Sequence, residues 1–187
     1  MQMNPNFNKI NLNLKNIDYN QFKSNRLMKE FNYGNGVFLR FFHINNMEYF
    51  KSCHITNPFI LLPYEVRYGE IEGPGNVRPH IDHRRSVALN YYFESGNCIT
   101  RTYSLKENAL MLAEKHNDGL SHNIYRDEDL IENGSFVAED GDAYLLNVSK
   151  IHSVECPGQK IRKFISYSWD YRNTFKEIYN GLIDYAI

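Results

Sequence analysis

The chain has 187 residues, enough for one domain with a sizeable core, and 42% of its residues are hydrophobic and 14% aromatic, which excludes an intrinsically disordered protein. Its net charge of −1 lacks the basic excess typical of nucleic-acid-binding proteins, and it has no apolar run of membrane-spanning length. We therefore expect a globular protein that has neither nucleic acid nor a membrane as a partner; the sequence leaves the oligomeric state open.

The first third of the chain combines an asparagine-rich lead with a few apolar segments. Apolar residues at irregular helical spacing predict a helix over residues 17–31, which a glycine-rich turn ends. Residues 37–42 are typical of a strand, and residues 60–62 and 66–70 of two further short strands.

From residue 78 onward, short strands follow one another closely, with Gly, Asn and Asp in the turns between them. Strands are predicted at residues 86–94, 97–105 and 143–148, and a helical turn or loop at residues 127–133. Residues 173–187 carry apolar side chains at helical spacing and predict an amphipathic helix on the outside of the sheet. This pattern predicts a mainly β fold with flanking helices, a double-stranded β-helix (jelly roll) of the cupin kind.

The chain contains no internal repeat, low-complexity linker or other sign of a domain boundary. We therefore predict a single domain over residues 1–187. Residues 1–65 are expected to form an N-terminal helix and strand support, residues 66–170 the jelly-roll core, and residues 171–187 the C-terminal helix.

The three cysteines, Cys53, Cys98 and Cys156, are widely spaced and form no CxxC pair. An odd number with this spacing predicts free thiols in a reducing compartment. Residues 1–15 also lack the apolar core of a signal peptide. Together these features predict a cytoplasmic protein.

Two potential metal ligands, His80 and Asp82, follow a Gly-Pro-Gly-Asn turn. Residues i and i+2 of a β-strand point to the same face, so both side chains can reach one ion. His152 begins another predicted strand and would complete the set if that strand lies alongside. Two histidines and one carboxylate form the facial triad of non-haem iron(II) sites, which leaves coordination positions open. His83 and Asp142 are the alternative ligands, although His83 would face the other way on a straight strand.

Arg162 follows His152 by ten residues and offers a fixed fork for a carboxylate. We expect a hairpin turn at residues 156–159 to join the two strands. A two-residue loop would pair His152 with Lys163, whereas a three-residue loop would pair it with Arg162. Because Ile165 and its alternate neighbours form an apolar face suited to packing under helices, we predict that Arg162 lies on the pocket face with His152.

Two stretches carry a family resemblance. Residues 78–93 resemble the first metal-binding strand of the iron(II)/2-oxoglutarate-dependent oxygenases, and residues 141–154, running on to Arg162, resemble their distal histidine and oxoglutarate arginine. The layout is most similar to the aspartyl/asparaginyl hydroxylase-like and prolyl-hydroxylase-like branches. Some aspartyl hydroxylase-type members lack the carboxylate ligand, so the intact Asp82 is nearer the general pattern. The resemblance covers about residues 66–170.

The resemblance implies that His80, Asp82 and His152 hold Fe(II). It further implies that 2-oxoglutarate binds the metal with its far carboxylate on Arg162, and that dioxygen is the second cosubstrate. The implied activity is that of a dioxygenase (hydroxylase), in which decarboxylation of 2-oxoglutarate to succinate accompanies hydroxylation of a C–H bond. The implied substrate is a small molecule, such as an amino acid or other metabolite, or a peptide side chain.

Three polar residues are further candidates for the cosubstrate pocket. Asn90 and Tyr92 share the expected inward face of their strand, and Ser166 lies four residues past Arg162. Each of them can instead be a core polar residue that its neighbours satisfy. Three arginines near the ligand pair are expected at the solvated surface, although one of them could reach an anionic substrate: Arg78, Arg84 and Arg85.

The residues alone leave two classes of function open. The first is the 2-oxoglutarate-dependent dioxygenase, and the second is a metal-binding cupin-type protein that uses the same ligands without 2-oxoglutarate, as another enzyme or as a binding module. Arg162 discriminates between them, since only the first needs a carboxylate fork. Neither a GxSxG elbow nor a glycine-rich phosphate loop occurs in the sequence, which gives no support to a serine hydrolase or a nucleotide-binding enzyme.

Overall fold

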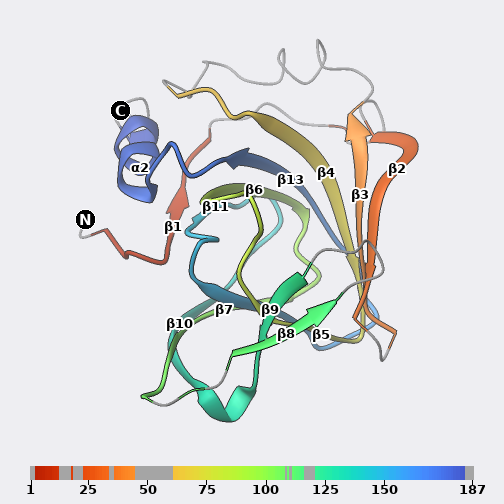
Figure 1. The fold of residues 1–187 in the computed structure, drawn as a ribbon. Helices are drawn as coiled ribbons and strands as arrows, with labels where there is room; N and C mark the ends of the chain where they lie inside the picture. The colour runs from red at the N-terminus through yellow and green to blue at the C-terminus, as the bar shows by residue number, and fades with distance from the viewer. Residues whose placement is uncertain are drawn as a thin grey trace.

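The chain folds into two antiparallel β-sheets that face each other (Figure 1). The computed structural model describes residues 3–12, 18, 23–33, 36–44, 61–107, 109, 111–115 and 121–183. Within these ranges, thirteen strands form the sheets, and one α-helix, α2 (Phe175–Ile183), lies beside β1 (Phe7–Ile10). None of the helices in these ranges is long and apolar enough to cross a membrane.

The larger sheet has seven strands in the order β1-β11-β6-β13-β4-β3-β2. Besides β1, its strands are β11 (Ala143–Leu146), β6 (Val87–Glu94), β13 (Arg162–Trp169), β4 (Glu65–Glu72), β3 (Phe38–Ile44) and β2 (Lys23–Asn32). The smaller sheet has six strands in the order β10-β7-β12-β5-β9-β8. These are β10 (Leu130–Val137), β7 (Ile99–Leu105), β12 (Ile151–Cys156), β5 (Gly75–His80), β9 (Ser121–Tyr125) and β8 (Met111–Lys115), and a 3₁₀ turn, η2 (Asp127–Asp129), precedes β10.

Consecutive strands alternate between the two sheets. From β4 to β7, and again from β11 to β13, each strand belongs to the sheet opposite its predecessor. The chain therefore winds around a common interior, and side chains from both sheets meet there. The predicted mainly β, double-stranded β-helix (jelly-roll) fold is confirmed.

Both faces of the larger sheet are covered, and alternate residues of its strands pack into two different clusters. Val87 and Leu89 of β6 belong to a cluster with Ile178 and Leu182 of α2 on the outside of the sheet. Tyr92 lies on the opposite face of β6 and belongs to a second cluster, which includes residues of the smaller sheet. The period-two pattern of β6 thus has the predicted faces, and the predicted C-terminal amphipathic helix packs on the outside.

Several local predictions are wrong. Residues 23–31, predicted as part of a helix, belong to β2, because its backbone pairs with β3 and tertiary pairing outweighs the irregular helical spacing. The rest of that prediction falls on residues 17 and 19–22, outside the described part. Residues 61 and 62 lie in no strand, and residues 130–133, predicted as a turn or loop, already belong to β10.

Gly69 of β4 leaves space for an aromatic ring of the neighbouring strand β13. It pairs with Phe164 across β4 and β13. A Cβ atom at residue 69 would lie 2.4 Å from Cζ of the Phe164 ring, closer than two carbon atoms can approach. Phe164 also lines the interior, and the absence of a side chain at residue 69 provides the space that its ring occupies there.

The substitution Gly69→Ala should destabilise the fold, since the Phe164 ring must shift within a packed core. We expect a loss of about 1–3 kcal/mol in the free energy of unfolding, measured by urea denaturation. Gly158→Ala is the matched control, because a Cβ there meets no atom within 4 Å. Equal stabilities of the two variants would contradict the close packing of Gly69 and Phe164.

Cys98 and Cys156 form a disulfide between the residue before β7 and the last residue of β12. The prediction of free thiols is therefore wrong for these two residues, and the argument for a reducing compartment loses its basis; Cys53 lies outside the described residues. The two cysteines are 58 positions apart in the sequence, so their spacing does not reveal that their strands pair, with Glu155 opposite Ile99. Both side chains are buried.

Thiol counting tests this bond directly. Of the three cysteines, we expect one to react with a thiol reagent in denatured, unreduced protein, and all three after reduction. A double variant, Cys98→Ser with Cys156→Ser, should give one thiol in both conditions. Three reactive thiols before reduction would rule the disulfide out.

Candidate metal centre

Two neighbouring strands of the smaller sheet bring the two histidines together. His80 is the last residue of β5, His152 is the second residue of β12, and the two are directly opposite each other in the antiparallel pair. Opposite residues share one face of a sheet, so both side chains point the same way. The centroids of the two imidazole rings lie 4.5 Å apart. The expectation that a second strand would bring the distal histidine alongside is thus met.

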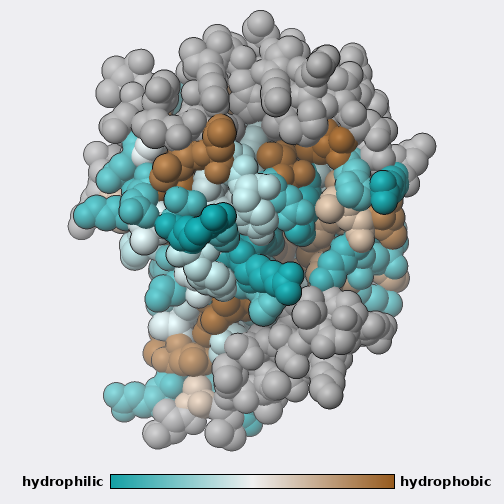
Figure 2. All heavy atoms as spheres, turned by 45° about the horizontal axis from the view of Figure 1, so that its top comes forward, coloured by the Kyte–Doolittle hydropathy of each residue, from teal (hydrophilic) through white to brown (hydrophobic). Residues whose placement is uncertain are grey.

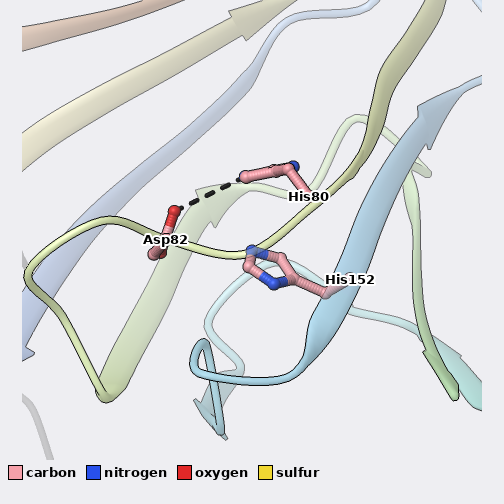
Figure 3. A group of neighbouring side chains, drawn as sticks. All are labelled: His80, Asp82 and His152. Carbon is pink, nitrogen blue, oxygen red and sulfur yellow. Dashed lines mark ion pairs between the residues drawn. The ribbon is translucent and has the colours of Figure 1, made fainter. Parts of the chain in front are cut away.

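Asp82 reaches the histidines from a loop, because β5 ends at His80. The Asp82 N–H donates to the carbonyl of Val148 at 3.1 Å, and the Tyr171 hydroxyl donates to the Asp82 carbonyl at 3.2 Å. These contacts, rather than strand alternation, place the carboxylate. Its Oδ1 lies 3.4 Å from Nε2 of His80, and one ligand atom from each of the three side chains falls within 4.8 Å of the others (Figure 3).

Each imidazole offers a free lone pair to this cluster. Nδ1 of His80 lies 2.7 Å from the carbonyl oxygen of Arg78, and Nδ1 of His152 lies 3.0 Å from that of Lys150. A carbonyl only accepts, so Nδ1 carries the proton in both rings and Nε2 is left with a lone pair. A backbone acceptor behind each ring is the usual arrangement around metal-binding histidines. The residues present therefore fit a divalent metal ion.

The charges of the cluster also suit a cation. Burial lowers the pKa of His152 to about 4, aided by the nearby His80 and opposed by Asp82, so this ring stays neutral at neutral pH. Burial acts to raise the pKa of Asp82, but Arg85 and the two histidines together bring it below its usual value. Arg85 donates from Nη2 to Oδ2 of Asp82 at 2.6 Å, which leaves Oδ1 toward His80. The carboxylate is thus ionised and held for binding through one oxygen.

Arg162 lies inside the barrel, with 2% of its surface exposed. Its Nε donates to the carbonyl of Ser95 at 3.2 Å, Nη1 to the Thr100 hydroxyl at 3.0 Å, and Nη2 to the carbonyl of Cys98 at 2.5 Å. Its guanidinium carbon lies 4.8 Å from the centroid of the Tyr92 ring. Burial lowers the pKa of Arg162, with Tyr92 opposing. Among the described residues no carboxylate pairs with it, so neutral groups accept its hydrogen bonds but leave its charge uncompensated.

The predicted hairpin between the strands of His152 and Arg162 is wrong. β12 pairs with β5 and β7 in the smaller sheet, whereas β13 pairs with β4 and β6 in the larger one. The turn between them crosses from one sheet to the other, as consecutive strands of this fold do. Arg162 and His152 nevertheless line the same interior cavity, because the inner face of β13 looks across the barrel at β12.

This inner cavity, of about 70 Å³, also collects the three other predicted cosubstrate residues, Asn90, Tyr92 and Ser166. Oδ1 of Asn90 is buried and has no hydrogen-bond partner. Nη1 of Arg85 lies 3.4 Å from the Ser166 hydroxyl. A buried acceptor without a donor is rare in folded proteins, so Asn90 marks a place where a bound water or ligand can donate a hydrogen bond.

A second, outer cavity of about 500 Å³ shares five lining residues with the inner one, among them His80, Asp82 and Arg85. Two of the candidate ligands, His80 and Asp82, thus lie between an interior space and an outer space. Figure 2 views the molecule with the top of Figure 1 turned forward and shows hydrophilic and hydrophobic patches around a central recess.

The residues near the ligand pair differ in their roles. Arg85, expected at the surface, is mostly buried against Asp82; only its closeness to Asp82 in sequence could have indicated this. Arg84 is exposed and lines the outer cavity, whereas Arg78 lines a separate groove.

Of the alternative ligands, His83 is exposed beside the cluster, and Asp142 pairs with Lys9 at 2.6 Å. Thr100, which holds Arg162, and Arg67, which lines the outer cavity, carried no signal in the sequence.

No protein-family model and no curated protein matches the chain. Among solved structures, pumpkin seed globulin is similar, with 13% identity and a TM-score of 0.39 over 88% of this chain and 34% of that one. Oxalate decarboxylase from Bacillus subtilis has 14% identity and a TM-score of 0.33 over 72% of this chain and 26% of that one. The chain thus spans about a quarter to a third of the length of these proteins, and at such low similarity they indicate nothing about its function.

Proposed function

We propose that the protein is a metal-binding jelly-roll protein of the cupin type that holds one divalent ion at His80, Asp82 and His152. The observation that carries this proposal is the convergence of three ligand atoms within 4.8 Å of one another. Two imidazoles and one carboxylate leave coordination positions open, an arrangement typical of Fe(II), which we propose as the ion. When bound, the ion would supply Lewis-acid or redox chemistry at those open positions.

Metal titration of purified, chelator-treated protein tests this proposal. Wild type should bind one equivalent of Fe(II), or of Mn(II) as an air-stable substitute, in calorimetry. His80→Ala and His152→Ala should lose stoichiometric binding, because two remaining ligands hold an ion weakly. His83→Ala is the matched control, since His83 is adjacent in sequence but outside the cluster. Retention of one equivalent by either ligand variant would contradict the proposed site.

The uncompensated charge of Arg162 favours a more specific proposal, that of a 2-oxoglutarate-dependent dioxygenase. Three of the five N–H donors of the guanidinium are engaged, which leaves two for a carboxylate. A dicarboxylate with one end at the metal ligands would bring its other end to this charge. In the proposed reaction, one oxygen atom of O₂ enters a substrate C–H bond and the other enters succinate, with release of CO₂.

Each lining residue would have a definite task in that reaction. Arg162 would bind and orient the far carboxylate, and the Tyr92 ring would cover one side of the guanidinium. Asn90 would accept a hydrogen bond through its unpartnered oxygen. The apolar residues of the cavity, such as Val77 and Leu146, would exclude water.

A metal-binding protein without 2-oxoglutarate is supported by two other observations. Arg162 already holds Ser95, Cys98 and Thr100, which suffices for a structural role. The inner cavity of about 70 Å³ has room for roughly two water molecules at about 30 Å³ each. 2-Oxoglutarate would therefore require side chains such as Arg85 to move.

Substitution of Arg162 separates the two proposals. Arg162→Lys keeps the charge but not the fork, and Arg162→Met removes the charge. For a dioxygenase, we expect both to weaken 2-oxoglutarate binding to the Mn(II)-loaded protein by about 10–100-fold, the value of a charged hydrogen bond, without changing metal stoichiometry. Calorimetry measures both affinities, and thermal unfolding confirms that each variant is folded.

The matching activity assay measures succinate formation from 2-oxoglutarate with Fe(II) and ascorbate, across a panel of amino acids and peptides. Stimulation over uncoupled turnover would name the substrate class. Equal 2-oxoglutarate affinity in wild type and both variants would exclude the dioxygenase and leave the metal-binding protein.

A further inference from the structure

The outer cavity carries more positive than negative charge. Four cationic side chains and three carboxylates line it. Each carboxylate already has a cationic partner: Glu65 pairs with Arg67, Asp82 with Arg85, and Asp170 with Arg172, which lies outside the cavity lining. A divalent ion at the metal ligands would add to the excess, so the cavity favours an anionic guest.

Arg67 presents an unsatisfied donor in this cavity. Its Nη2 donates to Glu65, but its Nε is buried and has no hydrogen-bond partner. The guanidinium carbon lies 5.4 Å from the centroid of the Phe41 ring, and that of Arg85 lies 6.0 Å from the same centroid. Both guanidinium groups thus lie near the same aromatic ring. A turn of the Arg67 side chain, which lines the cavity, would bring this unpaired donor to a ligand oxygen.

Arg84 stands at the same cavity with a backbone conformation that is uncommon for its residue type. Its φ angle is +67°, in the left-handed region that residues other than glycine rarely adopt. Such conformations persist where neighbouring contacts hold them, and they concentrate at ligand sites. Here two contacts hold the chain on the C-terminal side of Arg84. Arg85 pairs with Asp82, and the Ser86 hydroxyl donates to the backbone carbonyl of Asp170 at 2.6 Å. Within the described part of the chain, no hydrogen bond or ion pair engages the Arg84 side chain.

An apolar wall completes the cavity. Its members are mostly aromatic: Phe31, Tyr33, Leu39, Phe41 and Tyr64. At about 500 Å³ the space is in the range of small-molecule sites, which combine apolar walls with a few charged groups that fix orientation.

We propose that the outer cavity binds a small organic anion, with its oxyanion group on Arg67 and Arg84 and its apolar body against Phe41 and Tyr64. Because His80 and Asp82 line the same cavity, the apolar body would face the metal ligands. This names the substrate class of the proposed metal site and rests on that proposal for the reaction, but not for binding.

Calorimetry with full-length protein tests the anion preference, using 3-phenylpropionate and its neutral amide as probes. Wild type should bind the carboxylate at least about tenfold more tightly than the amide, and Arg67→Gln and Arg84→Gln should each reduce that preference by about tenfold. Arg101→Gln is the matched control, since Arg101 has similar exposure and ion pairs but lies outside this cavity. 2-Phenylethylphosphonate distinguishes a phosphonate-type group from a carboxylate as the preferred oxyanion.

The position of the probe is tested separately. With Mn(II) bound, relaxation of the probe protons should be enhanced in wild type and not in His152→Ala. Three results would each overturn the inference. They are equal affinity for carboxylate and amide, wild-type preference in both Arg67→Gln and Arg84→Gln, and absence of the enhancement in metal-loaded wild type.

Failure of the protein to bind metal would instead refute the proposed function, and the anion preference of metal-free protein would still decide this inference. Thermal unfolding of both variants, of which Arg84→Gln changes an exposed side chain, excludes misfolding as the cause.

Discussion

The antiparallel pairing of β5 with β12 is the constraint on which the candidate site depends. It puts His80 directly opposite His152, and each imidazole donates through Nδ1 to the backbone carbonyl two residues earlier in the chain. The strand pairing therefore fixes position, and the local backbone fixes the tautomer. Asp82 needs only a short loop beyond β5 to join them, and its backbone contact to Val148 holds that loop.

The second constraint is electrostatic and comes from the opposite sheet. Arg162 brings a permanent positive charge into the interior, where neutral groups accept its hydrogen bonds, and Arg85 brings another beside Asp82. Together with the arginines of the outer cavity, these charges favour anionic ligands in the space around His80, Asp82 and His152.

The sequence predicted the architecture and the three possible ligands, because period-two patterns and the spacing of His80 and Asp82 are local signals. It did not predict how Arg162 reaches the cavity. A hairpin needs two strands that are adjacent in sequence to pair with each other, whereas this fold places these two strands in opposite sheets. The disulfide and the burial of Arg85 were missed for a related reason, since both depend on contacts that no local pattern records. The helix predicted around residue 27 failed because β3 offers hydrogen bonds to that segment.

The disulfide has a consequence for how the two ends of the interior respond to binding. Cys98 supplies a carbonyl to Arg162, and its sulfur is bonded to Cys156 on the strand of His152. The Arg162 end of the inner cavity is thus covalently joined to the strand that carries His152, whereas ion pairs and ring contacts hold the described residues of the outer cavity. Side chains of the outer cavity can therefore rearrange without breaking this covalent link.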